Sequence, residues 1–414
     1  PNFKSSWNKE LFLTKKFFSG TWIINSCLWN QAFINTRNSS FKNEFHTVLL
    51  ESIRILENDK DKINKVFHLP IILAHKKHWE EINKSKEDAS LKLKIIQEYI
   101  RKDFKFSRCG FITHRNEFSY RYSWNIKPQI KLSLLIPMRD KVSLIKACLA
   151  SIKKYPPGIK IEVIIIDNDS KEFETLDFLN QFTKKGFADY KRKVIKISGK
   201  FNYSKLNNIA ANKVTGEVIL FLNNDIEFVR NNWGYELASN ALRSDVGCVG
   251  AKLLYRDNTI QHAGIIMGMG GVAGHLNKHF YNNEDICHEI NDQREYSALT
   301  GACLAISREK WITLGGFDEQ NLKVNYSDVD LCLRCNEIGL KNIYLPQVLA
   351  YHLESKSRGM PKGLGYLEWK REAFYMKKRW KLIIASDKYF NPNLSLNSEK
   401  ITLSFIDKKM INLR

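Results

Sequence analysis

Three apolar segments, each followed by polar residues, constrain the fold of this chain more than any other feature. Apolar runs of this length, separated by stretches with helical spacing, predict buried parallel strands in an α/β domain. Ligands of such folds bind beyond the carboxyl ends of the strands, where carboxylates and phosphate oxygens commonly hold Mg²⁺ or Mn²⁺. The pattern therefore predicts a nucleotide-binding sheet with a metal at its edge. The three segments are residues 132–136, 161–166 and 218–222.

The polar ends of these strands begin an ordered series of motifs. The motifs are Pro137–Asp140, Asp167–Ser170, Asn223–Asp225, Gly315–Asp318, Ser327–Asp330 and His352. In this order they resemble inverting family-two glycosyltransferases, which have a GT-A-type fold: an α/β, Rossmann-like mixed sheet flanked by helices. Three further segments resemble the rhamnosyltransferase-like, surface-polysaccharide branch of that family: residues 201–204, 259–264 and 354–359. The resemblance covers about residues 130–400.

The resemblance implies an enzyme of the inverting, hexosyltransferase type. Its donor would be a nucleotide sugar, and its acceptor a glycan or lipid-linked saccharide in bacterial surface polysaccharide synthesis, such as O-antigen or capsule. Two other functions are weighed against it. A nucleotidyltransferase shares the sheet and metal but needs a glycine-rich loop after the first strand, and Pro137–Asp140 contains no glycine. A non-catalytic module that binds sugars or partner proteins would not need Asp225, Asp328 and His352 together.

Four residues would form the reaction centre if the resemblance holds. Asp225 would be the carboxylate ligand of a divalent metal, Mn²⁺ or Mg²⁺, and His352 would reach the same ion. That ion would stabilise the charge on the departing diphosphate. Asp328 would be the general base that deprotonates the acceptor hydroxyl. Asp330 is a second candidate base, or it orients the helix start through Arg334.

The chain departs from the family pattern at two positions of this centre. Asn223 stands where the family commonly has the first acid of Asp-x-Asp, which leaves one charge fewer for a metal. Ser327 stands where a glutamate usually precedes the base. Structural alternatives stay open for both key residues: a core histidine at His352 and a helix N-cap alone at Asp328.

The remaining candidate site residues are assigned by their positions in the motifs. The amide of Asn168 would pair with a pyrimidine edge and Lys205 with the diphosphate, although asparagines at strand ends also close turns. The glycine-rich segment 264–274 predicts either a pocket wall with a moving lid or a tight β-hairpin. The nucleotide-binding candidates are Pro137, Arg139, Asp167, Asn168, Asn202, Lys205 and Asn224. The substrate-binding candidates are Gln261, His262, His275, Thr300, Gly301, Lys356 and Arg358.

The charge of the chain indicates an anionic partner. Lys and Arg number 65 against 44 Asp and Glu, a formal net charge of +21, although an AT-rich genome also produces lysine-rich chains. No nucleic-acid-binding motif is present, so a phosphorylated substrate or an anionic membrane leaflet is favoured over nucleic acid. Residues 366–380 predict a basic amphipathic helix that either lies on anionic lipid or caps the catalytic domain.

The sequence divides into four predicted parts. Residues 131–358 form the catalytic domain and residues 359–414 a C-terminal helical segment. Residues 66–75 loosely resemble residues 343–352. This internal repeat suggests that residues 1–75 are the degenerate, non-catalytic tail half of a preceding glycosyltransferase-like domain. The alternative is an unrelated helical extension. Residues 76–130 are predicted as a helical linker.

The location of the protein is predicted from what the sequence contains. There is no run of 18 apolar residues and no signal-peptide pattern, which favours the cytoplasm or the inner face of a bacterial membrane. The eight cysteines are expected to be reduced, with Cys332-x-x-Cys335 packed in a helix. The chain begins with Pro1, and we expect a fragment of a longer protein with other glycosyltransferase domains.

Overall fold

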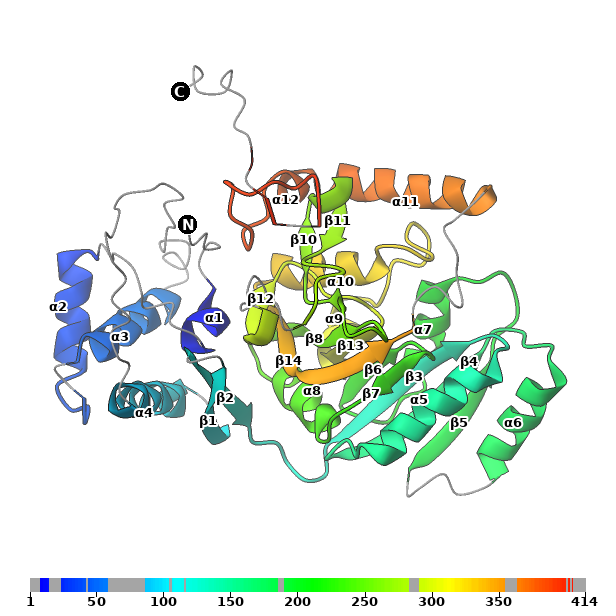
Figure 1. The fold of residues 1–414 in the computed structure, drawn as a ribbon, viewed down its shortest axis with the longest axis horizontal. Helices are drawn as coiled ribbons and strands as arrows, with labels where there is room; N and C mark the ends of the chain where they lie inside the picture. The colour runs from blue at the N-terminus through cyan, green and yellow to red at the C-terminus, as the bar shows by residue number, and fades with distance from the viewer. Residues whose placement is uncertain are drawn as a thin grey trace, which may run out of the picture. The chain divides into compact units, whose positions relative to one another are not determined.

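A computed structural model divides the chain into two compact units, Pro1–Asn125 and Ile126–Arg414 (Figure 1). The structure describes residues 8–14, 24–41, 44–58, 86–103, 106–114, 117–184, 190–282, 290–353, 363–399, 401–402 and 404. Lys356, Arg358 and the predicted repeat at residues 66–75 lie outside the described residues.

The first unit packs helices and a β-hairpin around one small core. Its described elements are α1 (Lys9–Thr14), α2 (Ser26–Asn35), α3 (Phe45–Asn58), α4 (Lys86–Asp103), β1 (Phe106–His114) and β2 (Glu117–Trp124). Leu50 of α3, Ile96 of α4 and Trp124 of β2 share the core, so segments on both sides of residue 75 fold together. The range 76–130 thus contains a helix and an antiparallel hairpin.

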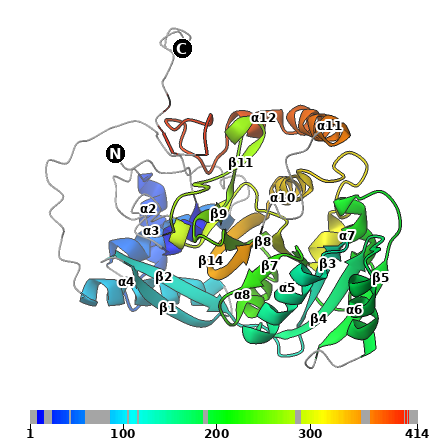
Figure 2. The ribbon, with the colours of Figure 1, turned by 45° about the vertical axis from the view of Figure 1, so that its right-hand side comes forward.

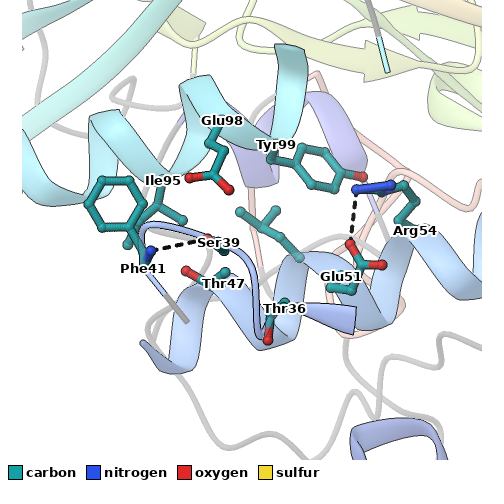
Figure 3. A pocket seen from close by; sticks show the side chains of 10 residues that line it. Thr36, Ser39, Phe41, Thr47, Glu51, Arg54, Ile95, Glu98 and Tyr99 are labelled. Carbon is teal, nitrogen blue, oxygen red and sulfur yellow. Dashed lines mark hydrogen bonds and ion pairs between the residues drawn. The ribbon is translucent and has the colours of Figure 1, made fainter. Parts of the chain in front are cut away.

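A pocket lies between α3, α4 and the turn after α2 in this first unit (Figure 3). Thr36, Phe41 and Ile95 are among the residues that line it. Glu51 and Arg54, which also line it, form an ion pair with each other at 3.0 Å.

The second unit contains one large mixed sheet with helices packed against it (Figures 1 and 2). The first half comprises β3 (Lys131–Met138), α5 (Val142–Lys154), β4 (Lys160–Asp167), α6 (Phe173–Lys184), β5 (Lys191–Lys196), α7 (Tyr203–Ala211), β6 (Val218–Leu222), β7 (Ile226–Phe228), α8 (Trp233–Ala241) and β8 (Val246–Leu254). The second half comprises β9 (Ile260–His262), β10 (Ile265–Met267), η1 (Met269–Gly271), β11 (Ala273–His275), β12 (Arg294–Tyr296), β13 (Cys303–Ser307), α9 (Arg308–Thr313), α10 (Ser327–Glu337), β14 (Lys341–His352), α11 (Leu364–Arg379) and α12 (Lys381–Ala385).

The order of the strands places a topological switch point within the sheet. The order is β12-β14-β8-β13-β6-β3-β4-β5, with β7 paired to β14 and β9 paired to β8. The strands β6, β3, β4 and β5 run parallel, whereas β13 is antiparallel to β6. The chain leaves β3 toward β4 and β5 and later returns to β6 on the other side, which makes β3 and β6 a topological switch point. The predicted mixed α/β sheet flanked by helices is confirmed.

The three apolar segments of the sequence form β3, β4 and β6, which are neighbours in this sheet. Every residue of β6 is buried, because helices cover the sheet and leave neither face to water. Complete burial of one such aliphatic side chain stabilises the fold by about 1.5–3 kcal/mol. The carboxyl ends of these strands are consequently held rigidly, and the polar residues that follow them are fixed in place.

The C-terminal helix α11 packs one face on this unit and leaves the other exposed. Ala373, Met376 and Trp380 are buried, whereas Leu367 and Phe374 are 61% and 70% exposed. The helix therefore does cap the domain, as one of the two predicted alternatives requires. None of the helices in the described ranges combines the length and apolar character needed to cross a bilayer.

Candidate functional site

The turn after β6 brings Asp225 against His352, a residue 127 positions later in the chain. Asn223–Asp225 connect β6 to β7, and β7 pairs with the end of β14 so that Ile226 lies opposite His352. This register places His352 Nε2 3.3 Å from Asp225 Oδ1. The N–H of Leu353 donates to the carbonyl of Asp225 at 3.1 Å and fixes the same junction.

This pair has the character of a cation site. Both side chains are buried, and Asp225 Oδ1 and His352 Nδ1 have no hydrogen-bond partner among the described residues. Apart from its 3.3 Å contact with His352 Nε2, this buried carboxylate oxygen is unsatisfied, which is costly, and a bound cation would remove that cost. Carboxylate and imidazole are ligand types that Mn²⁺ and Mg²⁺ sites use. Asn223 Nδ2, in place of the family's first acid, lies 3.3 Å from His352 Nε2.

Asp328 is held at the start of α10 by backbone N–H groups. Its Oδ2 accepts the N–H of Gly301 at 2.6 Å, and its Oδ1 accepts the N–H of Val329 at 2.8 Å. The residue retains some solvent exposure, yet the surrounding protein raises the pKa of its carboxyl through burial, partly opposed by these N–H donors. Tyr326, two residues earlier, adopts a left-handed conformation with φ 61°, which is unusual for a bulky side chain.

Residues Thr300–Ala302 connect this carboxylate to the Asp225 turn. The carbonyl of Ala302 accepts the N–H of Asn223 at 2.9 Å, one residue from the N–H that binds Asp328. Gly301 packs tightly against its neighbours: a Cβ there would lie 3.1 Å from Asp328 Cβ and 3.3 Å from the hydroxyl of Tyr203. The metal candidates and the candidate base are thus joined through one short backbone segment.

Two histidines lie beside the same segment. His262 Nδ1 and His275 Nδ1 are 2.9 Å apart, and the N–H of Thr300 donates to His262 Nε2 at 3.5 Å. Burial, together with the neighbouring His275 and His352, lowers the pKa of His262 well below its usual value. The glycine-rich segment forms the antiparallel hairpin β10–β11, which was one of its two predicted structures. Gln261 is buried next to His262 in β9.

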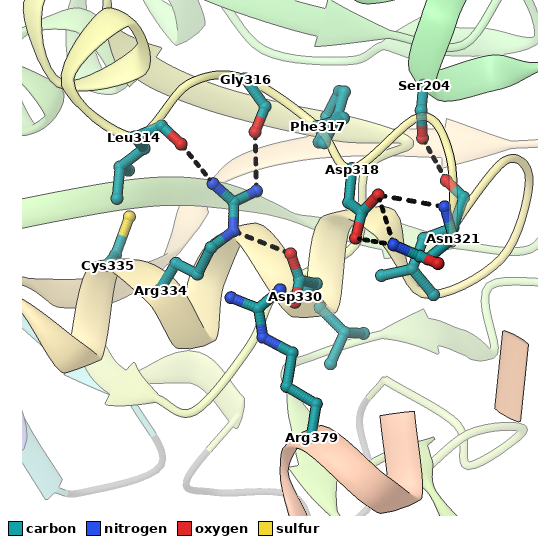
Figure 4. Close-up of polar contacts among 12 residues, drawn as sticks. Ser204, Leu314, Gly316, Phe317, Asp318, Asn321, Asp330, Arg334, Cys335 and Arg379 are labelled. Carbon is teal, nitrogen blue, oxygen red and sulfur yellow. Dashed lines mark hydrogen bonds and ion pairs between the residues drawn. The ribbon is translucent and has the colours of Figure 1, made fainter. Parts of the chain in front are cut away.

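Asp330 has different surroundings from Asp328 and lies beside Arg334 and Arg379 (Figure 4). It is fully buried, and its Oδ2 accepts from Arg334 Nε at 2.8 Å. Its Oδ1 accepts from Trp380 Nε1 at 3.0 Å and lies 3.4 Å from Arg379 Nη1. Arg334 also donates to the carbonyls of Leu314 and Gly316, both at 2.6 Å. These contacts favour the orienting role of Asp330 over its role as base.

The nucleotide candidates at the strand ends are engaged mainly with the fold. Asn168 Nδ2 donates to the carbonyls of Ile197 and Gly199, which leaves its buried Oδ1 without a hydrogen-bond partner among the described residues. Asp167 Oδ1 accepts the N–H of Ser170. Asn202 caps α7 by accepting the N–H of Lys205.

The accessible nucleotide candidates differ from these. Pro137 is buried within β3. Arg139, directly after β3, and Lys205, on α7, are exposed. Asn224 is half-buried beside Asp225. The exposed side chains of Arg139 and Lys205 can reach an anionic ligand at this edge of the sheet. The side-chain atoms of Asn168 and Asn202 that already bind the backbone cannot contact the ligand as well.

Glu372 is a positioning residue that the sequence did not reveal. It lies buried on α11, and its carboxylate accepts the N–H groups of Lys323, Val324 and Asn325 at 2.7, 3.0 and 3.0 Å. These three residues immediately precede the start of α10. The sequence held one signal for this role, since Glu372 is an acid among the apolar positions of the predicted helix. A carboxylate buried there needs hydrogen-bond donors from the rest of the fold.

Comparison with known proteins gives a consistent assignment. Residues 133–301 match the model of the family described as Glycosyl transferase family 2. The chain is 39% identical over 292 residues to the uncharacterized protein y4gI of Sinorhizobium fredii, covering 69% of this chain and 32% of that protein. It is 34% identical over 296 residues to the O-antigen biosynthesis protein RfbC of Myxococcus xanthus, covering 69% and 22%. This chain thus spans a third or less of the length of both relatives.

A solved structure shares the fold. The crystal structure of GalNAc-T7 with UDP, GalNAc and Mn²⁺ superposes with a TM-score of 0.50 at 15% identity, covering 68% of this chain and 54% of that one. At this identity the likeness concerns the fold alone.

Proposed function

We propose that this chain, which belongs to glycosyl transferase family 2 through residues 133–301, is an inverting glycosyltransferase. It would transfer a sugar from a nucleotide-sugar donor to a hydroxyl of a bacterial surface glycan or of its lipid-linked precursor. The observation that carries the proposal is the convergence of Asp225, His352 and Asp328. They come from three separate parts of the chain, and the backbone at Gly301 and Ala302 joins them.

Asp225 and His352 would hold a divalent cation, Mn²⁺ or Mg²⁺. Their orphaned buried atoms support this assignment. Within the described ranges, no group of three or more His, Cys, Asp or Glu side chains is arranged to hold a metal, so the two residues would share the ion with donor phosphate oxygens and water. When bound, the cation would stabilise the negative charge that develops on the departing diphosphate.

Asp328 would accept the proton of the attacking hydroxyl. The N–H groups of Gly301 and Val329 fix the direction of its carboxylate before the acceptor arrives. The raised pKa of Asp328 makes its carboxylate a stronger base than that of an exposed aspartate. Asp330 would hold α10 in place and take no part in proton transfer.

The donor would lie across the β3 and β6 ends, with Arg139 and Lys205 near its diphosphate and Asn224 near its ribose. The crystal structure of GalNAc-T7, which contains UDP and Mn²⁺, supports this class of donor. The name of RfbC, an O-antigen biosynthesis protein, supports a surface-glycan product. The cysteines at positions 148, 248, 303, 332 and 335 are free buried thiols, which supports a reducing cytoplasmic location.

A binding experiment on the purified chain tests this proposal. Thermal unfolding would be followed with UDP-, GDP- and dTDP-sugars, each with and without Mn²⁺, and repeated with Asp225→Asn. We expect one nucleotide to raise the melting temperature in a metal-dependent way, and we expect Asp225→Asn to abolish the metal dependence. A folded protein that responds to none of these ligands would contradict the proposal.

A further inference from the structure

The outward side of α11 combines exposed apolar side chains with cations. Leu367 and Phe374 are 61% and 70% exposed and lie seven residues apart, two helical turns along one face. Lys370, Arg371, Lys377 and Lys378 fall on the same face at helical spacing and are exposed as well. We call these six residues the basic-apolar face. Leu382 of α12, which follows directly, is 83% exposed.

The charge of this helix is one-sided. Its two acids do not balance the basic-apolar face: Glu372 is buried against residues 323–325, and Glu368 is 3.6 Å from Lys200, outside the helix. The cations are therefore presented outward without acidic neighbours on the same face of α11. An anionic bilayer presents negatively charged headgroups above apolar acyl chains. The cations of this face match the headgroups, and the exposed leucine and phenylalanine match the acyl chains.

The opposite side of α11 is firmly attached to the second unit. Met376 and Trp380 are buried, and Trp380 donates to Asp330 in α10. Figures 1 and 2 both show α11 on the outside of this unit, so the basic-apolar face does not serve the core. A partner bound there would be coupled through rigid contacts to the helix that carries Asp328.

We propose that the basic-apolar face of α11 docks the enzyme on an anionic lipid surface, with Leu367 and Phe374 entering the interface and the surrounding cations contacting lipid phosphates. Docking would hold the start of α10 at a fixed distance from the bilayer, where a lipid-linked acceptor presents its sugar. The docking itself is independent of the transfer reaction, since it needs neither donor nor acceptor.

Vesicle flotation of the intact chain tests the docking. The vesicles would contain phosphatidylcholine alone, or phosphatidylcholine and phosphatidylglycerol in equal parts, at physiological salt. We expect binding only to the anionic vesicles. The double variant Leu367→Ser/Phe374→Ser should lower the partition coefficient by roughly tenfold or more, and Lys370→Glu/Lys377→Glu by roughly 20-fold or more, since each cation contributes about fivefold.

Matched controls separate this face from the general charge of the chain. Phe173→Ser removes a phenylalanine that is 83% exposed on α6, and Lys184→Glu/Lys191→Glu reverses two exposed lysines elsewhere. Both should bind anionic vesicles within about threefold of the parent chain. Melting temperature and nucleotide binding, measured on every variant, confirm that each one is folded and report on the donor site separately.

Three results would overturn the docking. Equal binding to neutral and anionic vesicles would remove the role of the cations. Unchanged binding of the Leu367→Ser/Phe374→Ser variant would show that another basic surface is responsible. Absence of binding by the parent chain would leave an acidic protein as the partner of this face and exclude the bilayer.

Discussion

Asp328 and Asp330 lie two residues apart on α10, but their carboxylates differ in burial and in hydrogen-bond partners. Two residues correspond to more than half a turn of helix, so the carboxylates point in different directions. Asp328 meets only backbone N–H donors and keeps an accessible edge, whereas Asp330 is enclosed by Arg334, Arg379 and Trp380. A carboxylate that is already paired with guanidinium groups is a poor proton acceptor, which supports the proposed assignment of Asp328, and not Asp330, as the base.

The substitution Asp328→Asn should abolish transfer and leave donor binding intact. We expect kcat to fall by at least about 100-fold, because the amide cannot take a proton, while the Kd of the nucleotide changes by no more than a few fold. Steady-state kinetics and calorimetric titration measure the two effects. Transfer at the parent rate would remove Asp328 from the mechanism.

The pH dependence of the parent enzyme should report the same carboxyl. Burial raises the pKa of Asp328, so the protonated, inactive form persists to a higher pH than for an exposed aspartate, whose pKa is about 3.9. We therefore expect kcat to rise with pH through a midpoint above that value and then level off. Nucleotide affinity, followed over the same pH range, shows whether loss of donor binding causes the acid limb.

Gly301→Ala should reduce catalysis by displacing the base. The added methyl would lie 3.1 Å from Asp328 Cβ, so the base must move by a few tenths of an ångström. Since a 1 Å misplacement costs about 100-fold, we expect kcat to fall by roughly three- to tenfold. Gly234→Ala is the control, because a methyl there meets Pro157 at 2.8 Å, far from α10 in the sequence and in a different helix. Both changes should cost about 1–3 kcal/mol of stability through overpacking, but only the first should lower kcat.

At the scale of elements, the connection between α10 and α11 fixes the catalytic helix. Asp330 contacts Arg334 and Arg379 (Figure 4). It also accepts a hydrogen bond from Trp380, and Glu372 binds the backbone before α10. These contacts set the angle at which α10 presents Asp328 to Gly301.

Asp330→Ala should therefore destabilise the whole second unit. Removing one partner of a buried ion pair costs about 3–5 kcal/mol, because Arg334 is left without its carboxylate. Urea unfolding would measure the change in the free energy of unfolding. Asp177→Ala, at an exposed helical position on α6, should change it by less than about 0.5 kcal/mol. A similar small change at Asp330 would contradict the bracing role.

The sequence predicted the central strands better than it predicted the contacts between distant elements, and the roles of the candidate site residues stay predictions. Apolar runs identified β3, β4 and β6 because fully buried strands have an unmistakable composition. Ordered motifs placed Asp225 and His352 in one site, and their 3.3 Å separation agrees with that expectation. The role of Glu372 could not be predicted, because nothing local indicates which backbone a buried carboxylate will bind.

At the scale of the whole molecule, the two units have separate cores, and the boundary falls at Asn125. A truncation after residue 75 would cut through the first unit, because Leu50 and Ile96 belong to the same core. Whether this unit descends from a glycosyltransferase domain stays a prediction, since the segment that suggested a repeat lies outside the described residues.

Removing the first unit entirely should preserve the chemistry. We expect residues 126–414 to unfold cooperatively and to bind the nucleotide with a Kd within a few fold of that of the full chain, because the described site residues all lie in the second unit. Calorimetric melting and nucleotide titration test this. Complete loss of donor binding in a folded truncation would show that the first unit contributes to the site.

The pairing of β7 with the end of β14 has a consequence for how the protein is made. Asp225 emerges from the ribosome long before His352, and the two meet only when residues 341–352 insert beside β8 and align with Ile226. Asp328 is also translated after the stretch that matches the family model, which ends at residue 301. A nascent chain stalled before His352 therefore has most of its hydrophobic sheet but lacks a residue of the proposed metal site, so we expect a prematurely terminated product not to consume the donor.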